Sequence, residues 1–280
     1  MKTSLIDGKK MALEIQEELR QTIKTLERKP KLAVILVGNN PASLIYVGNK
    51  KKIGESIGAD TELFHLSPVM TEDALIAFVK ELNNNKEIDG VLVQLPLPEH
   101  INEDKVLSAL DPNKDVDGLH PSNLGNLFIS KTDLSPCTPL ACVKLIKSVE
   151  PDITGKTVVI IGRSRLVGKP LAQMLLAENC TVIQAHSKTK NMKEICQIAD
   201  IIVAATGKPH LIQKEFIKKG AIIIDVGITR LENNKITGDV DFEEVNGIAK
   251  AVTPVPGGVG PMTVTMLYIN LLTAYHKNNA

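Results

Sequence analysis

The sequence predicts an α/β protein with two domains, the second of which is a Rossmann-like, doubly wound parallel sheet. Short apolar segments rich in Val and Ile alternate with helical repeats along most of the chain, which is the pattern of a parallel sheet covered by helices. The length of 280 residues allows two independent cores, because single domains usually span about 100 to 200 residues. We therefore expect an N-terminal α/β domain over residues 1–138 and a doubly wound domain over residues 139–261.

The first half contains predicted strands and helices in alternation. Helices are predicted at residues 8–26, 40–54, 71–82 and 102–110, and strands at 31–37, 61–66 and 90–94. The first helix is amphipathic because Met11, Ile15 and Leu19 recur every four residues. Asn40 and Pro41 indicate the start of the second helix, with Asn as N-cap and Pro at the first helical position. Residues 111–136 contain many turn-forming residues and are expected to cross between the domains.

The second half repeats this alternation. Strands are predicted at residues 158–161, 182–185, 201–205 and 222–225, and helices at 138–149, 191–198, 213–218 and 262–275. A further helix follows the first of these strands, since Leu171, Met174 and Leu175 have helical spacing and Pro170 fits a first turn. The C-terminal segment 262–280 is expected to pack back on the N-terminal domain.

Composition and charge exclude several classes of protein. With 43% hydrophobic residues, 23% charged residues and a net charge of +1, the chain does not resemble a nucleic-acid binder, and a small-molecule partner is expected. No apolar segment reaches the roughly 20 residues needed to span a bilayer, and the first residues do not resemble a signal peptide. The prediction is a cytoplasmic protein without membrane contact. Its four cysteines are scattered, which indicates free thiols and no metal site.

The strand at 158–161 leads into a glycine-containing turn, Gly162-Arg-Ser164-Arg-Leu-Val-Gly168, which opens the next helix. Free N–H groups and the positive end of the helix dipole at such a turn suit a pyrophosphate. The spacing departs from G-x-G-x-x-G, because Ser164 replaces the second glycine and one extra residue precedes Gly168. A dinucleotide site and a purely structural turn are both compatible with these residues.

The end of the second strand of this domain bears on the choice of nucleotide. An acidic residue there normally binds the ribose hydroxyl of NAD, whereas this chain has His186-Ser187-Lys188. Together with Arg163 on the glycine turn, a hydroxyl flanked by basic groups suits the additional phosphate of NADP.

One helix face in the first domain combines a phenol with an amine. Ser43, Tyr46 and Lys50 lie three and four residues apart and therefore share a face. The charges of Lys51 and Lys52, together with partial burial, would lower the pKa of Lys50 and suit it for acid–base chemistry. The alternative is that the lysines form a solvated basic group and that Tyr46 belongs to the core.

Three further segments place polar side chains or permissive backbone at turns. Gln94 ends an apolar strand, where its amide could face a ligand or cap a neighbouring loop. Asp115 and Asp117 precede Gly118 in a turn, and they could bind a cation or accept hydrogen bonds from a ligand. Residues 253–263 are rich in Pro and Gly, so they could either approach a flat ligand closely or simply form a tight loop before the last helix.

Together these segments resemble the bifunctional methylenetetrahydrofolate dehydrogenase/cyclohydrolase family over essentially the whole chain. The motifs, in the order of that family, are Tyr46-Val-Gly-Asn-Lys50, Val93-Gln94-Leu95-Pro-Leu-Pro, Lys114-Asp-Val-Asp117-Gly, Gly162-Arg-Ser164, His186-Ser187-Lys-Thr and Pro256-Gly-Gly-Val-Gly-Pro-Met-Thr. Six motifs in register favour catalysis at Lys50 over a solvated basic face.

The resemblance implies a folate substrate, NADP as cofactor and a homodimer. In the N-terminal, catalytic domain it implies Lys50 as catalytic acid/base, Gln94 as its assistant, Tyr46 stacking on folate and Asp117 binding the pterin. The other implied substrate contacts are Ser43, Val93, Leu95, Pro256, Gly257 and Gly258. The implied NADP contacts are Gly162, Arg163, Ser164, Ser187 and the backbone around Ile228. Folate and nicotinamide are expected to meet in a cleft between the domains.

The implied reactions are oxidation of methylenetetrahydrofolate with NADP and hydrolysis of the methenyl product to formyltetrahydrofolate. Two alternatives fit the residues less well. A short-chain dehydrogenase also contains Tyr-x-x-x-Lys, but in that family the pair follows the nucleotide turn, whereas Tyr46 and Lys50 precede Gly162. A non-catalytic dinucleotide sensor would not need Lys50, Gln94 and Asp117 together.

Overall fold

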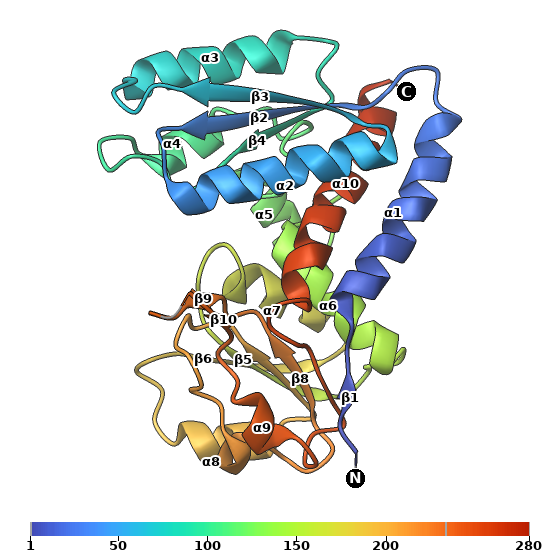
Figure 1. Cartoon of the computed structure of the whole chain (residues 1–280), viewed down its shortest axis with the longest axis vertical. Helices are drawn as coiled ribbons and strands as arrows, with labels where there is room; N and C mark the ends of the chain where they lie inside the picture. Colours follow the sequence, from blue (N-terminus) through green and yellow to red (C-terminus); the bar gives the residue numbers. More distant parts are fainter. Residues whose placement is uncertain (1, 233, 280) are drawn as a thin grey trace. The chain divides into compact units, whose positions relative to one another are not determined.

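The computed structural model describes residues 2–232 and 234–279, which form two compact α/β units (Figure 1). One unit contains the chain up to Ala12 together with Thr138–Thr263, and the other contains Leu13–Cys137 together with the chain from Val264 onward. The segment up to Ala12 was expected in the N-terminal domain, but it belongs to the unit that contains Thr138–Thr263. The reason is that β1 (Ser4–Leu5) pairs with a strand near residue 251. Met1 and Ala280, the ends of the expected ranges, lie outside the described residues.

The unit containing Leu13–Cys137 is built on a parallel, three-stranded sheet. Its strands, in sheet order, are β3 (Asp60–Leu66), β2 (Lys31–Val37) and β4 (Gly90–Val93). Helix α2 (Pro41–Ile57) lies on one face and α3 (Glu72–Asn84) on the other (Figure 1). The core under α3 also includes α4 (Glu103–Ser108) and alternate side chains of β2. This alternation of apolar strand and helix is the one that the sequence predicts.

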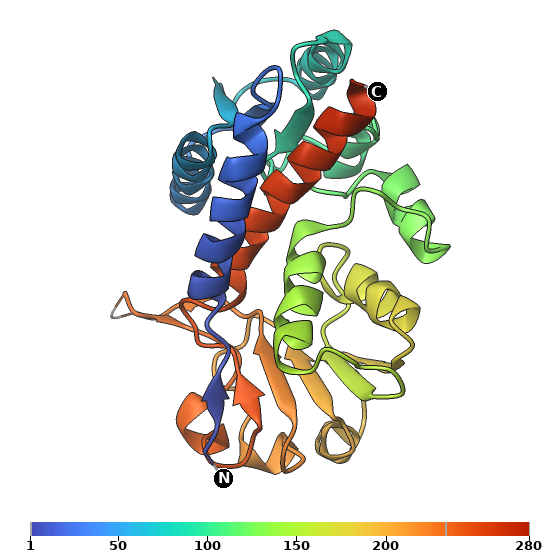
Figure 2. The same cartoon turned by 90° about the vertical axis from the view of Figure 1, so that its right-hand side faces the viewer.

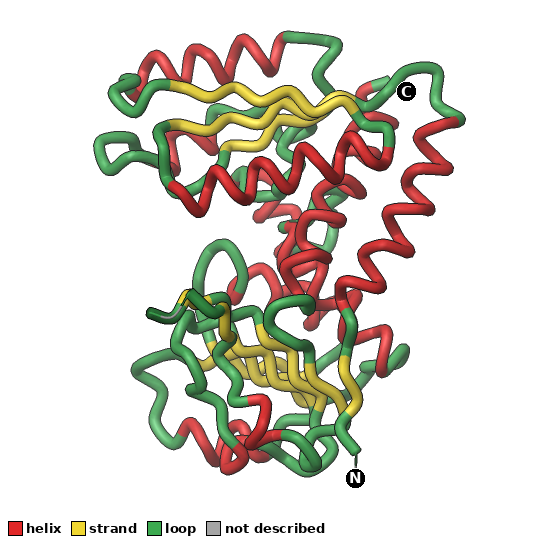
Figure 3. Tube along the Cα trace, viewed as in Figure 1, coloured by secondary structure: helices red, strands yellow, loops and turns green. Residues whose placement is uncertain are grey.

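The unit containing Thr138–Thr263 has a parallel sheet of six strands (Figure 3). Their order is β1, β11 (Ala251–Val252), β8 (Ile222–Asp225), β7 (Ile201–Ala204), β5 (Thr157–Ile161) and β6 (Thr181–Ala185). Because β5 is flanked by β6 on one side and β7 on the other, the chain reverses direction across the sheet there. Ligands of doubly wound sheets bind at such a reversal, beyond the carboxyl ends of the strands.

Several helices accompany the six-stranded sheet. Beside the sheet, α7 (Gly168–Ala177) packs against β5 and β6, and α8 (Met192–Gln197) contacts the 3₁₀ turn Lys214–Phe216. The remaining elements are α1 (Gly8–Lys24), α5 (Pro121–Phe128), α6 (Cys137–Val149), α9 (Phe242–Val245), α10 (Val259–Asn278) and the hairpin of β9 (Thr229–Arg230) with β10 (Ile236–Thr237). Figure 2 shows α1 and α10 side on. In the part of the chain that the structure describes, no helix is long and apolar enough to cross a bilayer.

Three predicted elements need correction. The helix expected at 213–218 is only the 3₁₀ turn, since Ile217 already has extended backbone angles. Helix α2 does not end at Gly54 but continues to Ile57, where Gly58 adopts the left-handed conformation that ends helices. Residues 111–136 include the short helix α5, which His120 and Pro121 initiate.

Candidate active site

Helix α2 begins as the sequence predicts, with Asn40 as its N-cap, and it places Ser43, Tyr46 and Lys50 on one face. The side chain of Asn40 accepts hydrogen bonds from the first turn, including that of the Ser43 N–H at 3.1 Å. Ser43 is buried, Tyr46 is 40% exposed, and Lys50 is half-buried one turn further on. The predicted face therefore exists, with Tyr46 at its exposed edge and not in the core.

The amine of Lys50 is oriented by a neutral amide. Its Nζ donates a hydrogen bond to Gln94 Oε1 at 2.8 Å, and Gln94 Nε2 donates to the Leu95 carbonyl at 2.8 Å. The second hydrogen bond fixes the direction of the amide, so that its oxygen faces the lysine. The backbone N–H of Gln94 donates to Ile35 at 2.8 Å, which extends the β2–β4 pairing to the site. Gln94 thus binds its own loop at Leu95 through its nitrogen and contacts Lys50 through its oxygen, the partner that the resemblance implies.

The pKa of Lys50 is lowered, as predicted, but for only one of the two expected reasons. Burial is the principal cause, while the carboxylate of Asp117 acts in the opposite direction. The neighbouring lysines are not among the causes: Lys51 is exposed and lies 4.0 Å from Glu55 in an ion pair. The half-buried position of Lys50, and not the run of positive charge, makes its amine easier to deprotonate.

The aspartate turn after α4 has one carboxylate that supports the fold and one that interacts electrostatically with the lysine. Asp115 is buried, and its Oδ2 accepts hydrogen bonds from the His120 N–H at 2.7 Å and the Asn123 side chain at 2.9 Å. Asp117 is half-buried and close enough to Lys50 to raise the pKa of the amine. The two aspartates therefore have separate environments. Among the described residues, no group of three or more His, Cys, Asp or Glu is placed to hold a metal ion.

Two neighbours of these aspartates are structural. Lys114 is buried, and its Nζ donates to the carbonyls of Asn83 at 2.8 Å and Asn85 at 2.7 Å at the end of α3. Gly118 has φ of +70°, and a Cβ there would lie 2.5 Å from Pro136 N. The turn therefore requires glycine at this position.

Helix α10 supplies contacts that the sequence analysis did not identify. The buried Asn270 donates from Nδ2 to the carbonyls of Val116 and Ser135, each at 2.8 Å, and so supports the segment that carries Asp117. Cys137 is buried beside it, and burial and the neighbouring Asp117 raise the pKa of its thiol well above the ordinary value. An amide between the apolar residues Ile269 and Leu271 was the available sequence signal for Asn270.

In the other unit, the glycine turn has no room for a side chain at Gly162 or at Gly168. Gly162 has φ of +142°, and a Cβ there would collide with the carbonyl oxygen of Ala205; a Cβ on Gly168 would collide with the carbonyl of Gly162. Ser164 Oγ accepts the N–H of Val167 at 3.1 Å and closes the turn before α7. The turn is therefore close-packed at its two glycines and leads directly into a ten-residue helix, whose free N–H groups suit a pyrophosphate.

The Gly162→Ala variant should lower the free energy of unfolding by about 2 kcal/mol or more, because it combines an unfavourable φ with the collision at Ala205. Urea denaturation measures the change. Gly155→Ala is the matched control, since Gly155 also has positive φ, at +72°, but open space around it. Equal losses in the two variants would mean that the collision contributes nothing.

The other residues expected at the nucleotide lie at the same sheet edge. Ser187 follows β6 and Ile228 follows β8, and both are exposed. Since the strands are parallel, their carboxyl ends meet the glycine turn after β5. Thr189 Oγ1 accepts the His186 N–H at 2.9 Å, which leaves Ser187 at the tip of a fixed turn. Arg163 is exposed on the neighbouring turn.

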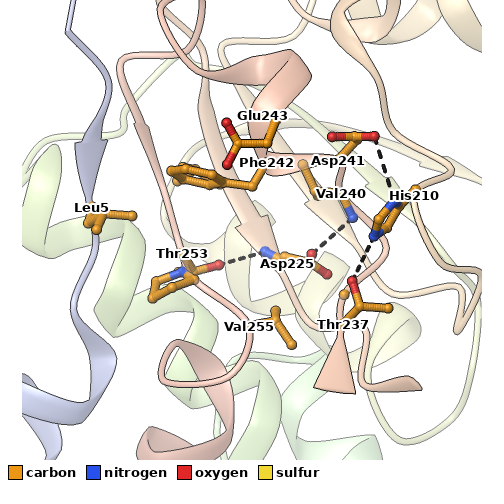
Figure 4. A pocket seen from close by; sticks show the side chains of 13 residues that line it. Leu5, His210, Asp225, Thr237, Val240, Asp241, Phe242, Glu243, Thr253 and Val255 are labelled. Carbon is orange, nitrogen blue, oxygen red and sulfur yellow. Dashed lines mark hydrogen bonds and ion pairs between the residues drawn. The ribbon is translucent and has the colours of Figure 1, made fainter. Parts of the chain in front are cut away.

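The turn that leads to Ile228 is anchored by a buried carboxylate. Asp225 accepts hydrogen bonds from the N–H groups of Gly227, Asp239 and Val240, each at 2.9 Å, and burial raises its pKa to about 6. A cavity of about 370 Å³ lies beside it (Figure 4). Its polar side chains bind one another, as in the 2.8 Å contact between His210 and Thr237. The lining includes residues 253–255 of the Pro- and Gly-rich segment, but none of the residues named individually as folate or NADP contacts.

The Pro- and Gly-rich loop is tightly bounded. Gly257 has φ of +108°, and its carbonyl accepts the Lys9 N–H at 2.8 Å. A Cβ on Gly258 would lie 2.6 Å from the Pro254 carbonyl. Helix α10 begins at Val259, inside the loop and earlier than the predicted start at residue 262. Pro256 itself is exposed.

One unit has a doubly wound sheet with a glycine turn at its reversal point, and the other has a half-buried lysine with its orienting amide. Together these features define a two-domain, dinucleotide-dependent enzyme. Family models agree with this class. Residues 6–117 match the catalytic domain of tetrahydrofolate dehydrogenase/cyclohydrolase, and residues 136–279 match its NAD(P)-binding domain. The chain belongs to the tetrahydrofolate dehydrogenase/cyclohydrolase family.

Similar proteins cover almost the whole chain. The "Bifunctional protein FolD" of Listeria innocua is 54% identical over 273 residues, 96% of each chain. The solved bifunctional FolD of Campylobacter jejuni is 45% identical, with a TM-score of 0.95 over 98% of this chain and 99% of that one. A Trypanosoma brucei FolD, solved with NADP and an inhibitor, is 37% identical, with a TM-score of 0.94 over 99% of this chain and 98% of that one.

Proposed function

We propose that this chain oxidises methylenetetrahydrofolate with NADP and then hydrolyses the methenyl product to formyltetrahydrofolate, as a bifunctional enzyme of one-carbon metabolism. Family membership across both units supports the two activities, and the Listeria innocua relative is described as bifunctional. The observation that carries the proposal is the Lys50–Gln94 pair: an amine of lowered pKa, hydrogen-bonded to an amide without charge.

The first reaction depends on NADP, which accepts a hydride from the methylene carbon when it is bound. The residues of this chain position it. The turn from Gly162 to Ser164 and the start of α7 would hold its pyrophosphate through backbone N–H groups. The backbone at Ile228 is fixed by Asp225 and contributes further contacts.

The second reaction adds water to the electrophilic methenyl carbon and opens the ring at a C–N bond. A base must take a proton from the water, and an acid must protonate the departing nitrogen. Neutral Lys50 takes one proton of the water, and the resulting ammonium donates it to the departing nitrogen. The second proton of the water leaves as the hydroxyl of the adduct becomes the formyl carbonyl, and it is released to solvent, so the reaction yields one proton overall. Burial favours the neutral amine at the start, and Gln94 Oε1 accepts a hydrogen bond from either form. One side chain thus performs both transfers.

The remaining predicted residues surround folate in this proposal. Tyr46, 40% exposed, stacks on the substrate, and Asp117 accepts hydrogen bonds from the pterin amino and ring N–H groups. The surrounding contacts come from Ser43, Val93, Leu95, Pro256, Gly257 and Gly258. We also propose that the enzyme is a cytoplasmic homodimer.

A direct assay tests the proposed function. Purified protein is mixed with methylenetetrahydrofolate and NADP, and reduced cofactor and methenyl absorbance are followed together. We expect reduced cofactor to accumulate while the methenyl compound is consumed. Nucleotide binding without turnover of either folate would instead indicate a dinucleotide sensor.

Cofactor choice gives a further prediction. Replacing Arg163 and Ser187 with Ala should raise the Michaelis constant for NADP at least roughly tenfold more than that for NAD, because two groups that bind the additional phosphate are lost. Both residues are exposed at the same sheet edge. Steady-state kinetics with both cofactors measure the effect. Wild-type enzyme that uses NAD equally well, or a double variant with unchanged discrimination, would contradict it.

A further inference from the structure

The hydroxyl of Tyr268 forms a hydrogen bond with the backbone of α2 at Lys50. Tyr268 lies on α10, is 1% exposed, and donates from its hydroxyl to the Lys50 carbonyl at 2.6 Å. The Gly54 N–H donates to the same phenol oxygen. Lys50 and Gly54 are four residues apart, so in an uninterrupted α-helix this carbonyl and this N–H bind each other. Here the phenol oxygen contacts both groups from outside the helix.

The surroundings are shaped to receive this hydroxyl. A Cβ on Gly54 would lie 2.5 Å from the Tyr268 oxygen and would also collide with Thr61 Oγ1, so only glycine admits the phenol. Thr61 Oγ1 lies 3.1 Å from the Tyr268 oxygen. Because a phenol has one proton, and Lys50 receives it, Thr61 is the donor in this second contact. The hydroxyl therefore has three oriented partners in a buried position.

We propose that Tyr268 is a positioning residue for ring opening, which fixes the backbone of Lys50 while Gln94 fixes its amine. This inference rests on the proposed function of Lys50. A lysine side chain is long and flexible, so a hydrogen bond at Nζ alone leaves the amine free to move with its helix. With the carbonyl bound by Tyr268 and Nζ bound by Gln94 at 2.8 Å, both ends of the residue are held.

Removal of the hydroxyl should change Lys50 in two ways. The Lys50 carbonyl then loses the hydrogen bond from Tyr268, so the helix turn that carries the lysine is free to shift and to misalign Nζ with Gln94. The amine also becomes more accessible to water, and its pKa rises toward the ordinary value because burial is what lowers it. A smaller fraction of the amine is then neutral near neutral pH.

The test is Tyr268→Phe, which removes one oxygen and retains the buried ring. We expect kcat for hydrolysis of methenyltetrahydrofolate to fall about tenfold, since a small misplacement of a reacting group is costly. The limb of the pH–rate profile that reports neutral Lys50 should move to higher pH. The folate KM should stay within about twofold, because Tyr46 and Asp117 are untouched.

Two parallel variants make the outcomes distinct. Tyr275→Phe removes a hydroxyl from the same helix, beside Arg28 and away from Lys50, and should keep the wild-type kcat and pH profile. Lys50→Met tests the proposed function. If Lys50→Met is inactive but Tyr268→Phe has the wild-type kcat and profile, the positioning role is wrong and the function stands, even if urea denaturation shows lower stability. If Lys50→Met is active, the proposed function fails, and the role of Tyr268 fails with it.

Discussion

Lys50→Met is expected to lower the rate of methenyltetrahydrofolate hydrolysis by about a hundredfold or more, the usual contribution of a general acid–base residue. Methionine has a similar length and no titratable group, so both proton transfers are lost while the shape is largely retained. Folate binding should partly survive, because Tyr46, Asp117 and Gln94 remain. The expected result is a hydrolysis rate lowered by about a hundredfold or more, together with folate binding that equilibrium titration can still measure.

The control for this variant is Lys52→Met. Lys52 is exposed on the same helix and two residues away, so its replacement removes the same charge without touching Gln94. It should leave hydrolysis unchanged. Near-normal hydrolysis by Lys50→Met would contradict the catalytic role of Lys50. Equal losses in the two variants would show that the run of lysines acts only through its charge.

Asp117→Ala is expected to weaken folate binding roughly ten- to a hundredfold, since a charge-assisted hydrogen bond to a ligand contributes about 1.5 to 3 kcal/mol. Both activities should fall together because they share the substrate. Kinetics of oxidation and of hydrolysis, measured on the same preparations, test this. A change confined to NADP affinity, or activity that depends on an added divalent metal, would contradict the role of Asp117.

The more conservative Asp117→Asn variant separates charge from shape. The Asp117 carboxylate raises the pKa of Lys50, so removal of its charge should lower that pKa further. The limb of the hydrolysis profile that requires neutral Lys50 should then move to lower pH, opposite to the shift expected for Tyr268→Phe. An unmoved limb would mean that the two groups do not interact in the working enzyme.

Local signals were sufficient for most of the fold. Runs such as 31–37 and 158–161 are long and apolar enough to predict buried strands, and the structure has strands β2 and β5 there. The missed strands β1 and β11 have two residues each, too few to show a period. They exist because distant segments pair, Ser4 with Ala251 among them. The 3₁₀ turn at 214–216 was overpredicted because a few apolar residues fit several periods.

The candidate site divides in the same way. The spacing of Ser43, Tyr46 and Lys50 on one helix face follows from helical geometry, and the structure has that face. The reason for the lowered pKa of Lys50 does not follow from spacing. It depends on burial by segments that are remote in sequence, and the adjacent lysines that the sequence makes prominent do not contribute.

By itself the sequence determined the alternation of strands and helices, the glycine turn after β5, and the family to which the motifs belong, because each is encoded within a few neighbouring residues. Only the tertiary structure decided that Asp115 is structural while Asp117 interacts electrostatically with Lys50, and that Gly54 admits a phenol instead of ending a helix. It also brought Tyr268 and Asn270 of the last helix to Lys50 and to the segment that carries Asp117. The physical reason is that burial and hydrogen bonding between remote segments depend on packing, which no local pattern of residues specifies.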